Sequence, residues 1–256
     1  MMDLTKTKKL LTEAKTIGDH ASAKRPWRSH AIVATIRGAA TPGRNQALLD
    51  VGQRIVFPRF ARLEAQFRRE LDDIFKNFEV YTVRRVRRIF RNIYTQAFQL
   101  GIAAAQGKTG DILQPLKPED KRWLETFLQK EFKLWDKFMD DVKAKRGKLD
   151  YQKRKEMYVQ ALTSVYNSAR VVVTPPTTLY YWETTPSEHC PHCLYLERMS
   201  PFTKDTLPTI PKSGDTKCLS NCNCHLRIEH VPVTKYLRAK AKGRSRAELL
   251  RGMRAQ

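Results

Sequence analysis

The stretch FARLEAQFRRELDDIFKNF (residues 60–78) carries large apolar side chains at intervals of three and four residues. They are Phe60, Leu63, Phe67, Leu71, Ile74 and Phe78. On a helix with about 3.6 residues per turn these side chains form one apolar stripe, and the charged residues between them face away from it. The stretch therefore predicts an amphipathic helix that packs against other helices.

Three further segments repeat this helical spacing. The first contains Val83, Val86, Phe90, Ile93, Tyr94 and Ala97. The second contains Trp123, Phe127, Leu128, Phe132, Trp135, Phe138, Met139 and Val142. The third contains Met157, Tyr158, Ala161, Leu162, Val165 and Tyr166. We expect three or four antiparallel helices that bury these stripes, including both tryptophans, against one another.

Single residues predict where these helices begin and end. Pro58 should break or kink the first run, because proline has no N–H and clashes with the preceding turn. Gly107 and Gly147 should end two helices. Pro118 suits a first helical turn, and the side chain of Asp150 suits an N-cap.

The helical spacing is lost from Val171 onward. We expect extended chain at 171–173 and a short strand at 179–182, whose Trp182 should pack against the neighbouring cysteine-containing unit. Residues 186–217 are rich in Pro, Ser, Thr, Lys and Asp and are predicted to be mostly loop. The alternating pattern at 224–228 predicts a second strand.

The composition indicates a strongly cationic globular chain. Its 256 residues include 48 Lys and Arg against 26 Asp and Glu, a net charge of +22, and 41% are hydrophobic. That apolar content excludes a wholly disordered basic tail. Because the chain has no run of 18 apolar residues, and its N-terminus lacks the apolar core of a signal peptide, we expect neither membrane insertion nor secretion. The charge favours phosphate-bearing or acidic partners.

All five cysteines lie within residues 190–224. They are Cys190, Cys193, Cys218, Cys222 and Cys224. An odd number of clustered cysteines favours a metal site over a disulfide framework. The Cys190-Pro-His-Cys193 motif can place two thiolates on one zinc ion, and Cys218 with either Cys222 or Cys224 would complete a tetrahedral set. We expect His189, His192 and His225 to be neighbours of the site and not ligands.

A closed thiolate site predicts structural Zn2+ and no enzymatic activity. A catalytic zinc keeps one position open and needs a nearby acid or base. The H-x-E signature of zinc deaminases and the H-E-x-x-H signature of metalloproteases are both absent from the sequence. A metal-dependent nuclease would have to use Asn221, Asn223, His225 and His230, and is the least favoured alternative. We therefore expect no small-molecule substrate.

These features predict a mainly α chain: an antiparallel helical region followed by a small zinc-stapled α+β unit, with basic extensions at both ends. The expected boundaries are 1–44 for a basic N-terminal arm and 45–171 for the helical domain. Residues 172–232 would form the zinc-binding unit, and 233–256 a basic tail or helix. From Lys235 to the end the sequence has eight basic residues and one acidic residue.

The order of motifs resembles that of the phage head morphogenesis, or Mu F-like minor capsid, family. An alanine-rich helical stretch, YTQAFQLGIAAAQG (94–107), precedes a second helical stretch that ends in YNSAR (166–170). Trp182, the Cys190–Cys193 motif, a proline-containing loop and the pair Cys222-Asn-Cys224 follow in that order. The family usually ends in histidine-proline-x-cysteine-x-cysteine. Here Cys218 lies near the histidine position, with one additional residue before Cys222.

The resemblance covers roughly residues 45–230 and implies a structural role in head assembly. The implied partners are the phage portal and major capsid proteins, and the implied location is the virion head, after assembly in the host cytoplasm. The departure at Cys218 implies that a cysteine replaces the family's histidine as a ligand. A zinc-ribbon nucleic-acid-binding protein without a virion role is the alternative that charge and thiols alone would support.

A run of arginines lies on the second predicted helix. It contains Arg84, Arg85, Arg87, Arg88 and Arg91, with no acidic residue among them. Their spacing places four of them on one helix face. Because unpaired like charges repel one another, we expect this face to contact packaged double-stranded DNA or an acidic protein surface without sequence preference.

Overall fold

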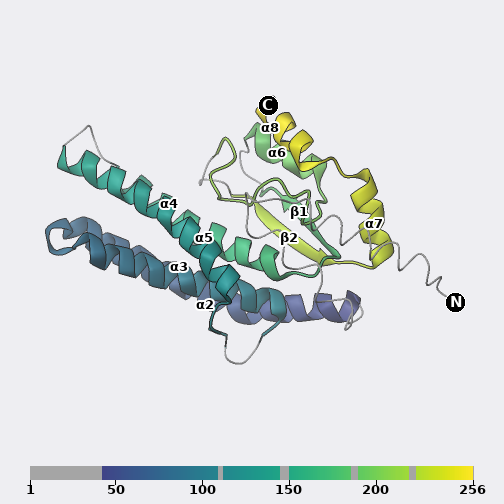
Figure 1. Ribbon diagram of the computed structural model, residues 1–256, viewed down its shortest axis with the longest axis horizontal. Coiled ribbons are helices and arrows are strands. Elements are labelled where there is room, and N and C mark those ends of the chain that lie inside the picture. Colours follow the sequence, from purple (N-terminus) through teal and green to yellow (C-terminus); the bar gives the residue numbers. More distant parts are fainter. Residues whose placement is uncertain (1–41, 109–111, 145–149, 186–189, 219–222, 256) are drawn as a thin grey trace.

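Four long helices pack along the long axis of the molecule, and a two-stranded sheet with shorter helices lies against one end of this bundle (Figure 1). The computed structural model describes residues 42–108, 112–144, 150–185, 190–218 and 223–255. The long helices are α2 (Pro42–Lys76), α3 (Val83–Gln106), α4 (Pro118–Lys143) and α5 (Tyr151–Val173). This arrangement confirms the mainly helical fold with a small sheet that the sequence predicts. Among the described helices, none combines the length and the apolar character needed to cross a membrane.

Most of the predicted helix boundaries are confirmed. Helix α3 ends at Gly107, whose φ of 64° is the left-handed conformation that favours glycine. Helix α4 begins at Pro118, and the Asp150 side chain caps α5 by accepting a hydrogen bond from the Lys153 N–H at 2.8 Å. Gly147 lies outside the described residues, and α4 already ends at Lys143.

Of the break or kink expected at Pro58, the break does not occur, because α2 continues through this residue. The side chain of Pro58 is exposed, so the Arg54 carbonyl that loses its N–H partner lies on the solvent side of the helix. Val56 and Phe60 on either side are buried in the core. This packing holds both halves of α2 in one helix. The helix instead ends at Lys76, and a single turn of 3-10 helix, η3 (Phe78–Val80), leads to α3.

The expected extended chain at 171–173 is also wrong, since α5 runs to Val173. Val171 is buried against the sheet side of the molecule, and this packing outweighs the weak preference of β-branched residues for strands. The helix ends where Pro175 forces the preceding Thr174 out of the helical region, to φ −67° and ψ 147°.

The smaller unit is built on two antiparallel strands, β1 (Thr178–Glu183) and β2 (His225–His230), with Tyr180 opposite Ile228. Both predicted strands are therefore confirmed. The described residues between them lie mostly outside helices and strands, as expected, although the segment also contains helix α6 (Pro191–Met199). Two helices follow β2: α7 (Val233–Lys242) and α8 (Arg246–Arg254), which begins with a capping box between Ser245 and Glu248.

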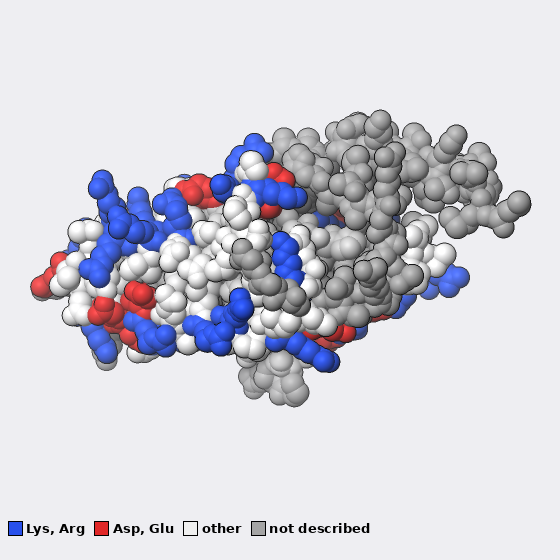
Figure 2. Space-filling view, turned by 90° about the horizontal axis from the view of Figure 1, so that it is seen from below, with Lys and Arg blue, Asp and Glu red and all other residues white. Residues whose placement is uncertain are grey.

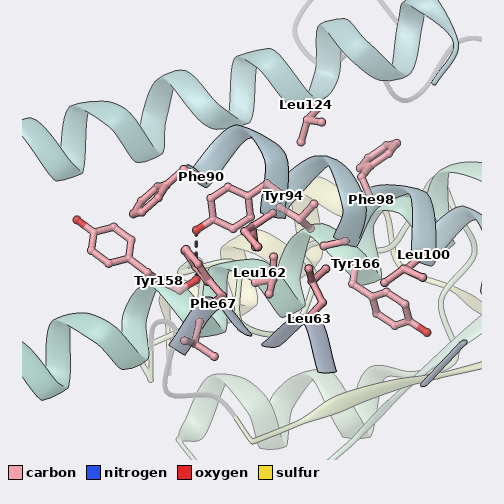
Figure 3. Close-up of a cluster of buried hydrophobic side chains, with 14 of the residues drawn as sticks. Leu63, Phe67, Phe90, Tyr94, Phe98, Leu100, Leu124, Tyr158, Leu162 and Tyr166 are labelled. Carbon is pink, nitrogen blue, oxygen red and sulfur yellow. Dashed lines mark hydrogen bonds between the residues drawn. The ribbon is translucent and has the colours of Figure 1, made fainter. Parts of the chain in front are cut away.

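Two clusters of buried side chains correspond to the helical bundle and to the smaller unit. The first joins the stripes of α2, α3, α4 and α5, and Figure 3 shows its aromatic side chains from several helices pointing toward one another. Trp135 is buried in this cluster as predicted, and Trp123 is partly buried against it. The second cluster contains Trp182 together with Cys193 and Cys224. Trp182 thus packs within the cysteine-containing unit, as the sequence suggested.

A carboxyl group is buried inside the helical cluster. Glu131 of α4 is 8% exposed, and the Tyr94 hydroxyl donates to it at 3.4 Å. The same hydroxyl donates to the Tyr158 carbonyl at 3.2 Å (Figure 3). Burial raises the pKa of Glu131 to about 7, against a smaller lowering by the Tyr94 hydrogen bond. The folded state therefore favours the protonated carboxyl.

Glu131→Gln should stabilise the protein at alkaline pH. A raised carboxyl pKa means that the folded state holds a proton that the unfolded state releases, so stability falls as pH rises from about 4.5 to about 7 and stays low above that. The cost amounts to about 3 kcal/mol. We expect the difference in unfolding free energy between Glu131→Gln and wild type to increase by about that amount from pH ~4 to pH ~8.5, measured by urea titration. A difference independent of pH would contradict the assignment.

Candidate metal centre

Cys190 and Cys193 are held together by the first turn of α6. Cys190 is the N-cap residue, and its carbonyl accepts hydrogen bonds from the N–H groups of Cys193 at 3.0 Å and Leu194 at 3.3 Å. Pro191 occupies the first helical position, where its missing N–H costs nothing. Because residues three apart share a helix face, both thiols point to the same side.

The third thiol belongs to Cys218, which lies near the end of the segment between β1 and β2. The Cys218 Sγ lies 3.4 Å from the Cys190 Sγ and 3.5 Å from the Cys193 Sγ, and the first two sulfurs are 3.4 Å apart. Sulfur ligands of a tetrahedral zinc ion, each about 2.3 Å from the metal, are about 3.8 Å apart. The three sulfurs therefore form a nearly equilateral triangle of the size of one face of such a tetrahedron.

Neighbouring groups favour the charged form of the Cys190 thiol. Partial burial opposes ionisation of the Cys190 thiol, but the Cys193 N–H and the neighbouring thiols lower its pKa overall. The Thr216 hydroxyl lies 3.2 Å from the Cys218 Sγ. Thiolates at the N-terminus of a helix are stabilised by its dipole and are the form that binds metals.

A folded loop returns the chain from α6 to the thiol cluster. Tyr180 and Phe202 form two backbone hydrogen bonds, of 2.8 and 2.9 Å, that fix the start of this loop on β1. Near its end, the carboxylate of Asp215 accepts hydrogen bonds from the hydroxyls of Thr209 at 2.6 Å and Ser213 at 3.0 Å. These contacts hold the segment that leads to Cys218, and no local sequence pattern indicates them.

Three of the five cysteines predicted as ligands meet at one point. Within the described residues, the group whose ligand atoms lie within 4.8 Å of one another consists of Cys190, Cys193 and Cys218. Cys224 is buried nearby but is not part of this group, and Cys222 lies outside the described residues. This cluster has the donor chemistry and the dimensions to hold a metal ion.

Among the described residues, His192 and His225 are not part of the thiol group. His192 Nδ1 accepts a hydrogen bond from the Lys217 N–H at 3.2 Å. His225 is exposed on β2, with its Nε2 2.9 Å from a carboxylate oxygen of Glu183. His189 lies outside the described residues.

The five arginines of α3 do not form one unpaired face. Arg87 pairs with Asp136 at 2.6 Å and Arg91 with Glu125 at 2.8 Å, both acids of α4, and Arg85 lies over the Tyr81 ring. Arg84 and Arg88 are exposed, and neither has an acidic partner among the described residues. Of the four arginines expected on one helix face, Arg87 and Arg91 are thus paired with acids of α4. The partners of Arg87 and Arg91 are 49 and 34 residues away, so no local pattern could indicate them.

Lys and Arg side chains are nonetheless prominent on the surface. On the face shown in Figure 2 they cover more area than Asp and Glu side chains do. Comparison of the chain with protein-family models, with curated proteins and with solved structures gave no match.

Proposed function

We propose that this chain is a structural minor capsid protein of a phage head, whose C-terminal unit is held together by a zinc ion. The convergence of Cys190, Cys193 and Cys218 supports this proposal most strongly. These cysteines lie in the block that carries the resemblance to the head morphogenesis family. On this proposal the protein is not an enzyme, and its partners are the portal and major capsid proteins.

Zinc is the metal that this donor set favours. Soft thiolate ligands select zinc over magnesium or calcium, and four-thiolate zinc sites in proteins are structural. Either Cys222 or Cys224 would supply the fourth thiolate. A unit of two short strands and short helices has little core of its own, so a metal that joins α6 to the end of its loop would contribute directly to folding.

The location of the protein in the virion provides the test. An antibody raised against the chain should detect it in purified, DNA-filled heads and in portal-containing procapsids, with zinc present in the same gradient fractions. Recovery of the chain only as free protein, separate from capsid shells, would contradict the virion assignment. It would favour the zinc-dependent nucleic-acid-binding alternative.

A second candidate, sequence-independent DNA binding, is favoured by the exposed arginines of α3. Arg84→Gln/Arg88→Gln should weaken binding of a duplex oligonucleotide by about tenfold and reduce the slope of log affinity against log salt by about two. Arg87→Gln/Arg91→Gln is the matched control, because these arginines already pair with Asp136 and Glu125. Fluorescence anisotropy at several salt concentrations would measure both. Equal losses for the two double variants would show that overall charge, and not this pair, determines binding.

A further inference from the structure

A groove of about 340 Å³ lies between α2 and α3, away from the thiol cluster. Arg59, Arg62 and Arg69 of α2 line it, and no acidic residue does. With a rise of about 1.5 Å per residue, these arginines are distributed along about 15 Å of the helix. The groove is therefore long enough to contact about three helical turns of a partner.

The three arginines are available for a ligand. Within the part of the chain that the structure describes, none of them forms an ion pair. Arg68, on the opposite side of α2, shows the contrast, because it pairs with both Glu64 and Glu156. Arginine side chains grouped without acids favour an anionic ligand.

The groove also has apolar walls. Leu63 and Leu100 are almost completely buried beneath it, and Leu113, which borders it, is 45% exposed. The side-chain amides of Gln66 and Gln96 add hydrogen-bonding groups between the helices. A ligand that fits all of these side chains must combine negative charge with apolar surface. The phosphates of a nucleic-acid backbone would match only the arginines.

We propose that this groove binds an acidic amphipathic helix of a partner protein. Leucine-like side chains on one face of that helix would contact Leu113 and the apolar walls, while Asp or Glu side chains beside them would pair with Arg59, Arg62 and Arg69. Grooves of this kind bind helices through anchors at positions i, i+3, i+4 and i+7. The chain's own first 45 residues do not have the required charge, with nine basic and three acidic residues. This inference goes beyond the phage-head assignment and does not depend on it.

Binding of a synthetic helix to the full-length protein tests the proposal. The probe is a fluorescein-labelled peptide of about 14 residues with leucines at helical spacing and glutamates between them. Arg59→Gln/Arg62→Gln/Arg69→Gln should weaken its binding at least tenfold, and Leu113→Ser about fivefold. The matched control is Lys130→Gln/Lys133→Gln/Lys137→Gln, which removes three exposed cations of α4 outside the groove and should change affinity less than about twofold.

Comparison ligands test whether the peptide binds only through non-specific attraction between opposite charges. A peptide with the same residues in an order that disrupts the leucine stripe should bind at least about tenfold more weakly than the helical design. Equal binding of the two peptides, no measurable binding of the designed helix, or equal losses for the groove and control variants would overturn the proposal. If the groove variant weakened binding of a duplex oligonucleotide but not of the peptide, the arginines would be nucleic-acid contacts and the proposal would be wrong.

Discussion

Cys193→Ser should abolish stoichiometric zinc binding and unfold the C-terminal unit. Cys193 is 1% exposed and lies among the buried side chains that join β1, β2, α6 and α8. Structural zinc sites contribute about 10–16 kcal/mol of binding free energy, which is available only when the ligands are held together. Loss of one thiolate should therefore cost several kcal/mol, more than a small unit can lose.

The response to a chelator separates metal loss from poor packing. Removal of zinc from the wild type should lower the unfolding temperature of this unit by more than about 10 °C, whereas Cys193→Ser should show no difference between zinc and chelator. Ile228→Ala is the control, because Ile228 is buried on β2 and lies outside the thiol cluster. It should lower stability yet keep the chelator response. An unchanged chelator response in Cys193→Ser would exclude this thiol as a ligand.

Gly101→Ala should destabilise the helical end of the molecule by about 3 kcal/mol. A Cβ atom at this position of α3 would lie 2.3 Å from the Tyr166 carbonyl oxygen and 2.7 Å from the Ala169 Cβ, both on α5. Because one of these neighbours is backbone, the two helices would have to move apart. The gain of about 1 kcal/mol in helix propensity offsets only part of that cost.

The matched control is Gly243→Ala, at the end of α7. There a new Cβ would lie 3.2 Å from the Ala239 carbonyl oxygen, and φ is −71°, which any residue adopts. We expect a change below about 1 kcal/mol for this variant. Urea denaturation of both variants measures the contrast. Equal unfolding midpoints for Gly101→Ala and wild type would show that α3 and α5 are not held at this separation.

Local signals predicted most of the helices and both strands. Gly107, Pro118 and Asp150 act through their own backbone or the adjacent turn, so their roles could be read from the sequence. A break at Pro58 and extended chain from Val171 do not occur, because burial of Val56, Phe60 and Val171 against distant residues outweighs the local preferences. The sequence does not specify such tertiary contacts in any simple pattern.

The candidate metal centre was predictable only in part. The spacing of Cys190 and Cys193 indicates that both bind the same metal ion, because one helical turn brings their thiols together. The choice of Cys218 depends on hydrogen bonds within the preceding loop, including those of Asp215, that spacing cannot reveal. The groove lined by Arg59, Arg62 and Arg69 was not predicted from the sequence. Its walls come from two helices, and the apolar stripes do not specify that these two helices pack side by side.

Zinc K-edge absorption spectroscopy on the freshly purified, reduced protein tests the central claim most directly. We predict one zinc per chain with three or four sulfur scatterers at about 2.3 Å. A sample that contains no stoichiometric zinc, or whose zinc is surrounded only by nitrogen and oxygen at about 2.0 Å, would contradict the thiolate site.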